Sequence, residues 1–503
     1  MTKSQEYLST RASKEPYLSF EATVLRGLAP GGGLFIPAEI PKVEDVTAWA
    51  GKSFEELAFE IFSLYISRDE ISADELKELI RHSYSTFRAE TVTPLVKVDG
   101  LYVLELFHGP TYAFKDVALQ FVGNLFEFFL NRRNAGKSGV RERLTVVGAT
   151  SGDTGSAAIY GLRGKQDVSI FILHPLGKVS PVQELQMTTV TDSNVHNFAV
   201  KGNFDDCQDI VKTLFDDVEF NTKHHLGAVN SINWARILAQ ITYYFHSYFS
   251  LVKTAGPDVK VRYVVPTGNF GDILAGFYAK RMGLPIDKLI VATNSNDILD
   301  RFWKSGVYEK APPGVAEHVD ETLSPAMDIL ISSNFERLLW YLAREQLADS
   351  AEQAGEYIQK WMVELKMNGR VTVPEKVLSA GLLEFGSERV SDNETVSTIS
   401  SIYDSADGYV LDPHSAVGVA ASLRNLDSAH TYISLSTAHP AKFGDAVDMA
   451  LKTKAEYSFD KVMPDEFKLL QTLPKNVTVI DKPDISLVKT AIEKELKEEG
   501  IVF

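Results

Sequence analysis

From about residue 93 onward, the chain alternates short β-rich runs with stretches of helical periodicity. The clearest β-rich runs are LTVVGA, VSIFILHP, VRYVVP, KLIVAT and YISLST. Helical stretches such as FKDVALQFVGNLFEFFL and WARILAQITYYFHSYF stand between runs of this kind. Strands that alternate with helices predict parallel sheets with helices on both faces. We therefore expect an α/β protein.

The length of the chain, 503 residues, exceeds what one hydrophobic core usually serves. In the N-terminal part, Ser53 and Glu56 form a capping-box pattern ahead of one helix, and Ala73–Tyr84 predicts another. We expect a mostly helical N-terminal unit at 1–92, followed by two parallel-sheet α/β domains at 93–254 and 255–455. A tail that ends in a helix should occupy 456–503.

Charge and cysteine content exclude several functions. The formal net charge of −16 disfavours nucleic acid as the main partner, because phosphate backbones need a basic face. The single cysteine, Cys207, excludes an internal disulfide, and no histidine spacing or HExxH motif indicates a metal site. No run of 18 uncharged apolar residues predicts a membrane helix, and the first 16 residues lack the apolar core of a secretory signal. We expect a cytoplasmic protein.

The stretch LFHGPTYAFKDVALQ places one lysine, Lys115, between aromatic and apolar residues. Taken alone, the segment allows two interpretations. The lysine could snorkel to the surface from the start of a buried helix. Alternatively, a lysine with a lowered pKa in a partly apolar site could form a Schiff base with an aldehyde.

Three β-rich runs end in small or polar residues, and ligands gather at that edge of an open α/β sheet. The first loop, GATSGDTGSAA, could bind a ligand or could only cap the helix that follows. The second, Gly268–Gly271, suits a phosphate at a helix N-terminus but lacks the Lys-Ser/Thr of a P-loop. Its neighbour Asp272 would repel a phosphate, so we expect its carboxylate to point away and cap the helix. The third run ends at Thr437.

A fourth element, NSINWARI, brings Ser231, Asn233 and Arg236 together before an apolar helix. The serine and asparagine could be no more than an N-cap. Arg236 opposes the helix dipole, which favours acids at this end. An anionic ligand, which arginine can bond bidentately, explains its position better. With the amine of Lys115, these elements offer a phosphate cup, a partner for a ring nitrogen and a carboxylate pocket, which together are what pyridoxal phosphate requires.

Six motifs in order resemble the threonine synthase family, in its fungal/bacterial-type branch: HGPTYAFKD, GATSGDTGSAA, NSINWARI, PTGNFGDILAG, DPHSAVG and STAHPAKF. The N-terminal STR and GLAPGGGLFIP share the resemblance. It implies the pyridoxal-phosphate fold type II, with two α/β domains and pyridoxal 5'-phosphate between them. It also implies conversion of O-phospho-L-homoserine and water into L-threonine and phosphate, the last step of threonine biosynthesis, by a monomer.

The resemblance also assigns roles to residues. Lys115 is similar to the Schiff-base lysine, and Thr437 to the hydroxyl that faces the pyridine nitrogen. The cofactor-phosphate loop corresponds to Gly268, Asn269, Phe270 and Gly271, with Asp272 at its edge. The loop that grips the substrate carboxylate and flanks the phenolic oxygen of the cofactor corresponds to Ser151, Gly152, Asp153 and Thr154. Related enzymes commonly carry asparagine where Asp153 stands, which leaves the role of this acid open. The site for the leaving phosphate corresponds to Ser231, Asn233 and Arg236.

Three other functions compete with this interpretation. A type II threonine/serine dehydratase would share the lysine and the phosphate loop but would act on unphosphorylated hydroxyamino acids. A threonine-synthase-like phospholyase would eliminate phosphate and release 2-oxobutyrate and ammonia. A non-catalytic metabolite-binding protein would be expected to have lost the lysine or the phosphate loop, and this sequence keeps both.

Overall fold

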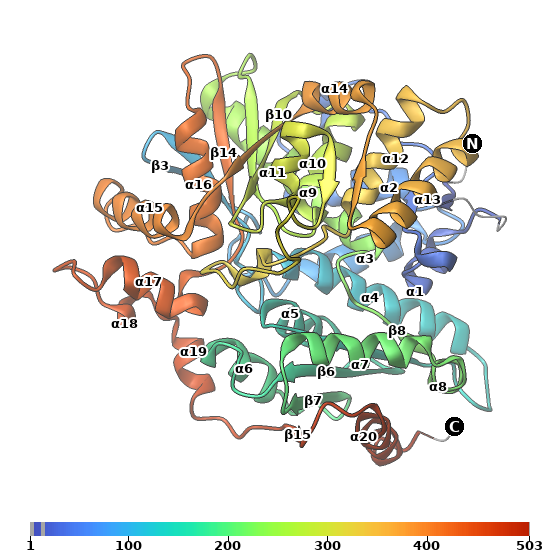
Figure 1. The fold of residues 1–503 in the computed structure, drawn as a ribbon. Coiled ribbons are helices and arrows are strands. Elements are labelled where there is room, and N and C mark those ends of the chain that lie inside the picture. Colours follow the sequence, from blue (N-terminus) through green and yellow to red (C-terminus); the bar gives the residue numbers. More distant parts are fainter. Residues whose placement is uncertain (1–4, 12–15, 502–503) are drawn as a thin grey trace.

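A computed structural model describes residues 5–11 and 16–501. It has two mainly parallel sheets, one above the other in Figure 1, with helix α4 (Lys115–Asn134) between them. Helix α4 packs on α5 (Asp153–Leu162) toward the smaller sheet and on α9 (Trp234–Ala255) toward the larger one. The predicted α/β architecture is confirmed.

The larger sheet has six strands in the order β13-β10-β9-β14-β4-β3. All its neighbouring strands are parallel except the β3–β4 hairpin. Its strands are β3 (Leu95–Val98), β4 (Leu101–Glu105), β9 (Val261–Pro266), β10 (Ile286–Thr293), β13 (Phe385–Arg389) and β14 (Thr431–Ser436). Its helices besides α9 include α10 (Gly271–Met282), α11 (Ile298–Ser305), α14 (Glu375–Glu384), α15 (Asp392–Ser405), α16 (Pro413–Asn425) and α17 (Gly444–Leu451).

The smaller sheet has five strands, all parallel, in the order β15-β7-β6-β5-β8. Its strands are β5 (Leu144–Ala149), β6 (Val168–Pro175), β7 (Val195–Val200), β8 (Leu226–Gly227) and β15 (Thr478–Ile480). Its helices besides α5 are α6 (Pro181–Thr188), α7 (Phe204–Asp216), α8 (Val218–His224) and α20 (Ile485–Glu498). The run VSIFILHP, which is β6, is buried along its whole length, as expected for a central parallel strand.

The division of the chain between the sheets differs from the predicted boundaries. Strands β3 and β4 fall in the segment 93–254 but belong to the larger sheet, where β4 pairs with β14. The tail 456–503 supplies β15, which pairs with β7 at the edge of the smaller sheet. Parallel pairing joins segments far apart in sequence, so local patterns of hydrophobicity carry no record of it.

The N-terminal unit is mostly helical, with α1 (Phe20–Arg26), α2 (Phe54–Tyr65) and α3 (Ala73–Tyr84) beside a small antiparallel pair, β1 (Tyr7–Ser9) and β2 (Phe35–Pro37). Both bonds of the predicted Ser53–Glu56 capping box are present. Helix α2 packs on α9, and α3 on α4. The unit therefore supports the two helices that carry Arg236 and Lys115.

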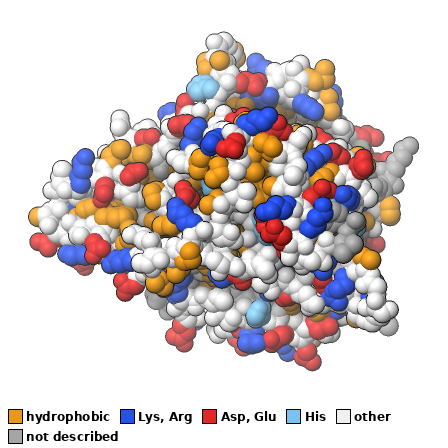
Figure 2. Space-filling model, turned by 90° about the horizontal axis from the view of Figure 1, so that it is seen from below, with side chains coloured by type: hydrophobic (Ala, Val, Ile, Leu, Met, Phe, Trp, Pro, Cys, Tyr) orange, Lys and Arg blue, Asp and Glu red, His pale blue; other side chains and the backbone are white. Residues whose placement is uncertain are grey.

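A second small pair, β11 (Val307–Glu309) and β12 (Arg370–Thr372), lies near α12 (Phe335–Gln346) and α13 (Ala351–Asn368). Short helices α18 (Phe459–Val462) and α19 (Asp465–Leu470) connect α17 to β15. Among the described residues, no helix is long and apolar enough to cross a bilayer. On the face seen from below in Figure 2, basic and acidic side chains are interspersed, and no broad basic surface appears there.

Candidate active site

Lys115 is the first residue of α4 and is 9% exposed. Burial disfavours the charged ammonium and lowers the pKa of Lys115 to about 8. Its Nζ lies 3.9 Å from Asp153 Oδ2 and 5.3 Å from the centre of the Phe114 ring. The lysine is therefore buried at the junction of the two sheets and does not snorkel to the surface.

The loop before Lys115 is fixed by the first turn of α4. Asp116 accepts hydrogen bonds from the Thr111 backbone N–H and hydroxyl, at 2.8 and 2.7 Å. A Cβ on Gly109 would lie 2.4 Å from the Asp116 side chain, so this position requires glycine. The Phe114 N–H donates to the Thr437 carbonyl at 2.8 Å. Thr437, which directly follows β14 and is 6% exposed, therefore lies against the start of α4.

The predicted phosphate loop leads from β9 into α10. Phe270 adopts the left-handed conformation, with φ of 61°, immediately before the helix begins at Gly271. A helix N-terminus leaves its first N–H groups without intrahelical acceptors, which suits an anion. A Cβ on Gly268 would lie 3.0 Å from the Ala326 carbonyl oxygen, so the loop passes close to another backbone segment.

Asp272 does not cap α10 as expected. Its carboxylate accepts hydrogen bonds from the hydroxyls of Tyr243 and Tyr244 on α9, at 2.5 and 2.9 Å. Burial raises the pKa of Asp272 to about 7. The expectation that the carboxylate points away from a bound phosphate is consistent with this geometry, but its partners are tyrosines on the neighbouring helix.

Residues 332–334, just before α12, hold the phosphate loop and were not anticipated from the sequence. The Ser332 hydroxyl donates to the Gly268 carbonyl at 2.6 Å, and the Asn334 side chain donates to the Asn269 carbonyl at 2.9 Å. The Ser333 hydroxyl lies 3.1 Å from Asn269 Oδ1 and 3.3 Å from the Ser231 hydroxyl. These short polar residues show no periodic pattern, so the sequence offered no signal for them.

The loop after β5 is built around Thr150 and Gly152. The Thr150 hydroxyl accepts from the N–H groups of Gly152 and Gly155, so it caps the start of α5. Gly152 has φ of 153°, and a Cβ there would lie 2.3 Å from Gln183 Oε1. Both conditions require glycine. Asp153 then opens α5 with its carboxylate buried beside Lys115, whereas Ser151 is exposed.

Asp153 has a partner that the sequence did not reveal. Lys442, in the short 3-10 helix η4 (Pro440–Phe443) after β14, places Nζ 2.6 Å from Asp153 Oδ1. Gln183 donates to the same oxygen at 2.7 Å. Burial alone would raise the pKa of Asp153, but Lys442, Lys115 and Gln183 together hold it well below its usual range. In the sequence, Lys442 has the appearance of an ordinary surface lysine in PAKF.

Asn233 and Arg236 lie at the start of α9, where Asn233 is the N-cap. The Asn233 oxygen accepts from the Ala235 N–H, and its nitrogen donates to the Val24 carbonyl, so the protein itself occupies this amide. Arg236 is 3% exposed and donates to the Val229 carbonyl at 3.0 Å. Its Nε has no hydrogen-bond partner in the described part of the chain. Burial lowers the pKa of Arg236 to about 10.

The residues of this site fit pyridoxal phosphate. An aldehyde needs an amine that is readily deprotonated, which Lys115 supplies. A phosphate needs backbone N–H groups at a helix start, which α10 supplies behind Gly268. Arg236 leaves a buried guanidinium N–H without an acceptor, which indicates a second anionic group. The site therefore has donors for a phosphorylated aldehyde and for a further anion.

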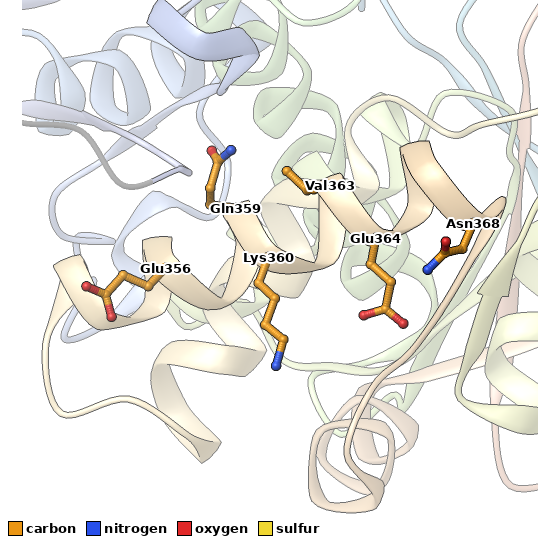
Figure 3. A pocket seen from close by; sticks show the side chains of 6 residues that line it. All are labelled: Glu356, Gln359, Lys360, Val363, Glu364 and Asn368. Atoms are coloured by element: carbon orange, nitrogen blue, oxygen red, sulfur yellow. The ribbon is translucent and has the colours of Figure 1, made fainter.

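Other features offer weaker candidates. His439 accepts from the Ala441 N–H, and burial lowers its pKa to about 4, so it is a neutral local cap. The structure shows no cluster of three metal-binding side chains within residues 5–11 and 16–501. A surface hollow runs along α13, and its lining side chains all come from that one helix (Figure 3). A ligand site needs convergent groups from several elements, and this hollow has none.

Comparison with known proteins shows which family the chain resembles. The family model "Threonine synthase N terminus" matches residues 6–84, "Pyridoxal-phosphate dependent enzyme" matches 86–380, and "Threonine synthase, C-terminal" matches 415–492. The threonine synthase of Saccharomyces cerevisiae is 59% identical, over 98% of this chain and 98% of the relative.

Two solved structures agree. The crystal structure of threonine synthase from yeast superposes with a TM-score of 0.94 at 58% identity, over 98% of this chain and 99% of that one. The structure of threonine synthase from Brucella melitensis with PLP bound gives 0.88 at 44% identity, with the same coverage. The cofactor of this protein is pyridoxal phosphate. The chain belongs to the threonine synthase family of pyridoxal-phosphate-dependent enzymes.

Proposed function

We propose that the protein converts O-phospho-L-homoserine and water into L-threonine and inorganic phosphate, as a carbon–oxygen lyase acting on phosphates. The observation that carries this proposal is Arg236. A buried guanidinium near Lys115, whose Nε has no partner within residues 5–11 and 16–501, is suited to a second phosphate beyond that of the cofactor. A dehydratase acting on unphosphorylated hydroxyamino acids has no use for such a group.

We assign the cofactor to Lys115, the loop Gly268–Gly271 and Thr437, with Asp272 behind the loop. When bound, pyridoxal phosphate withdraws electrons from the α-carbon of the substrate. The amine of Lys115, which has a pKa of about 8, takes a proton from Cα of the substrate. Loss of a second proton, from Cβ, drives the phosphate off Cγ; Lys115 then delivers a proton to Cγ, and Cα regains its proton after water has added at Cβ. Thr437 offers a neutral hydroxyl to the ring nitrogen, so the protein does not fix a proton there with a carboxylate.

We assign the substrate to the two loops that face these groups. Arg236, with Ser231 nearby, holds the phosphate at Cγ and stabilises it as it leaves. The N–H groups at the start of α5, from Ser151 to Thr154, hold the substrate carboxylate. Asn233 acts by capping α9 and so aims Arg236 into the site. Water then adds at Cβ, which gives threonine.

Product analysis tests the proposal. With O-phospho-L-homoserine, the purified protein should release phosphate and L-threonine in equal amounts, and Lys115→Ala should release neither. Lys165→Ala is a suitable control, since Lys165 is a partly buried lysine that bonds Asn124 and Glu127 away from the site. Release of 2-oxobutyrate and ammonia in place of threonine would instead identify a phospholyase. Activity on serine or threonine alone would identify a dehydratase.

We extend the proposal to a cytoplasmic monomer, as the resemblance to the fungal and bacterial branch implies. Light scattering at enzyme concentrations should give the mass of one chain, 55.8 kDa. Fluorescence microscopy of the tagged full-length chain should show diffuse cytoplasmic signal.

A further inference from the structure

Lys442 is one of the most deeply buried charged side chains of the protein, with 1% of the residue exposed. A lysine ammonium is rarely buried unless it is paired, because removal from water is costly. Lys442 Nζ lies 2.6 Å from Asp153 Oδ1 and donates to the Thr111 carbonyl at 2.8 Å. Both partners lie close to Lys115, since Asp153 faces its amine and Thr111 bonds the neighbouring Asp116.

The pairing gives the two oxygens of Asp153 different roles. Oδ1 receives Lys442 and the Gln183 amide, at 2.6 and 2.7 Å. Oδ2 receives neither and faces Lys115 Nζ at 3.9 Å. Two donors on one oxygen fix the rotation of the carboxylate, so the other oxygen is aimed at the reactive amine.

Lys442 also joins the two halves of the site. It belongs to η4, which follows strand β14 of the larger sheet, whereas Asp153 and Gln183 lie on α5 and α6 of the smaller sheet. The Lys442 carbonyl accepts from the Ser180 hydroxyl at 3.2 Å, just before α6. The ion pair therefore lies where the carboxyl edges of both sheets meet.

We propose that Lys442 is a positioning residue of the active site, which holds Asp153 as a charged carboxylate with Oδ2 directed at Lys115. The Asp153–Lys442 pair then takes the place of the neutral side chain expected beside the phenolic oxygen of the cofactor. The two charges depend on each other, because either Asp153 or Lys442 alone would be a buried, uncompensated charge beside Lys115.

Four charged groups near Lys115 influence its pKa, which can be measured. They are Asp153 on α5, Lys442 on η4, Arg236 on α9 and Asp116 on α4. Apart from burial, the carboxylates raise the pKa of Lys115, and the cations lower it. Loss of Lys442 should therefore make Lys115 titrate at higher pH, and loss of the Asp153 charge should make it titrate at lower pH.

The test measures the reactivity of Lys115 in the full-length protein freed of cofactor. Dinitrophenylation is followed against pH, and the Lys115 peptide is quantified by mass spectrometry. In Lys442→Met the pH at which Lys115 reacts at half its maximal rate, the midpoint, should rise by about one unit. In Asp153→Asn this midpoint should fall by a similar amount. The double variant should lie between them. Because the experiment uses neither substrate nor cofactor, its result does not depend on the reaction proposed above.

A lysine that serves only for packing would leave the midpoint unchanged in Lys442→Met, and that result overturns the proposal. If Lys442→Met does not fold, Asp153→Asn is compared with the double variant, in which no uncompensated carboxylate remains. These two differ only at residue 442, and the midpoint must be higher in the double variant. Equal midpoints would overturn the proposal as well.

Discussion

Three residues with ordinary side chains become unusual through burial. Lys115, Arg236 and Asp272 are all buried, and burial favours the neutral form of each: it lowers the pKa of Lys115 and Arg236 and raises that of Asp272. For Lys115 this gives an amine that loses its proton more readily than an ordinary lysine, and the Nε of Arg236 has no acceptor among the described residues. The sequence indicated both residues, through the apolar company of one and the helix position of the other.

Arg236 should act on the substrate rather than on the cofactor. Arg236→Lys keeps the positive charge but loses the forked donor, so kcat/KM for O-phospho-L-homoserine should fall about 10- to 100-fold, as expected for a charge-assisted hydrogen bond. Inhibition by inorganic phosphate should weaken in parallel, and cofactor absorbance should persist. Arg344→Lys, on the surface side of α12, serves as control. Loss of cofactor with unchanged phosphate inhibition would reverse the assignment of the two anion sites.

Asp272 should make stability depend on pH. Its pKa is raised to about 7 in the folded protein, against about 3.9 when unfolded, so the folded state holds a proton between these values. Stability from this group is therefore highest below about pH 4 and declines as pH rises to about 7. Asp272→Asn removes the dependence, so its free energy of unfolding relative to wild type should increase from pH 5 to pH 8. Urea unfolding at several pH values measures this, and a constant difference would contradict it.

At the scale of elements, the start of α16 holds two parts of the cofactor site together. Asp412 caps α16 and binds His414 and Ser415. The Ser415 hydroxyl accepts from the Thr437 N–H at 3.0 Å, and His414 Nε2 accepts from the Ala326 N–H at 3.1 Å, behind Gly268. The motif DPHSAVG thus contacts both Thr437, which we propose faces the ring nitrogen, and the segment behind Gly268 of the proposed phosphate loop.

Ser415→Ala should weaken cofactor binding because the buried Thr437 N–H loses its acceptor. We expect a loss of about 1–3 kcal/mol at this position, part of which appears as a several-fold higher dissociation constant for the cofactor. Ser422→Ala is the matched control, since Ser422 is a buried serine on the same helix whose hydroxyl donates to the Gly418 carbonyl. Equal cofactor affinity in both variants would show that α16 has no part in the site.

Elements with strong local signals were predictable from sequence, and their contacts were not. The capping box of α2, helix α3 and the loop before α10 all follow from residues a few positions apart. Lys442 and Ser333 owe their roles to partners 289 and 64 positions away, at Asp153 and Asn269. No local sequence pattern identifies such partners, and a lone lysine or serine of this kind would be predicted to be an exposed surface residue.

At the scale of the molecule, the tail completes the smaller sheet. Helix α20 contributes Val488, Ile492 and Leu496 to a separate core under β6 and β7. The one cysteine of the chain, Cys207, lies in the same core, and burial raises the pKa of its thiol to about 12. The rate at which this thiol reacts therefore reports how often this core opens.

Ile492→Ala should loosen the smaller sheet by about 2 kcal/mol or more, because it leaves a cavity in a small core. Labelling of Cys207 by a thiol reagent should then become about 30-fold faster, since opening precedes reaction. Lys494→Ala, an exposed position on the same helix, should change the rate little. If both variants label at the wild-type rate, α20 does not stabilise this sheet.

In the proposed reaction, Lys115, Arg236 and the loops around them remove phosphate from Cγ and add a hydroxyl from water at Cβ. Turnover of O-phospho-L-homoserine in ¹⁸O-labelled water follows the atoms directly. We expect one ¹⁸O in the hydroxyl of L-threonine and none in the released phosphate, because the carbon–oxygen bond breaks. Label in the phosphate, with homoserine as the product, would mean that the phosphorus–oxygen bond breaks, and would contradict the proposed reaction.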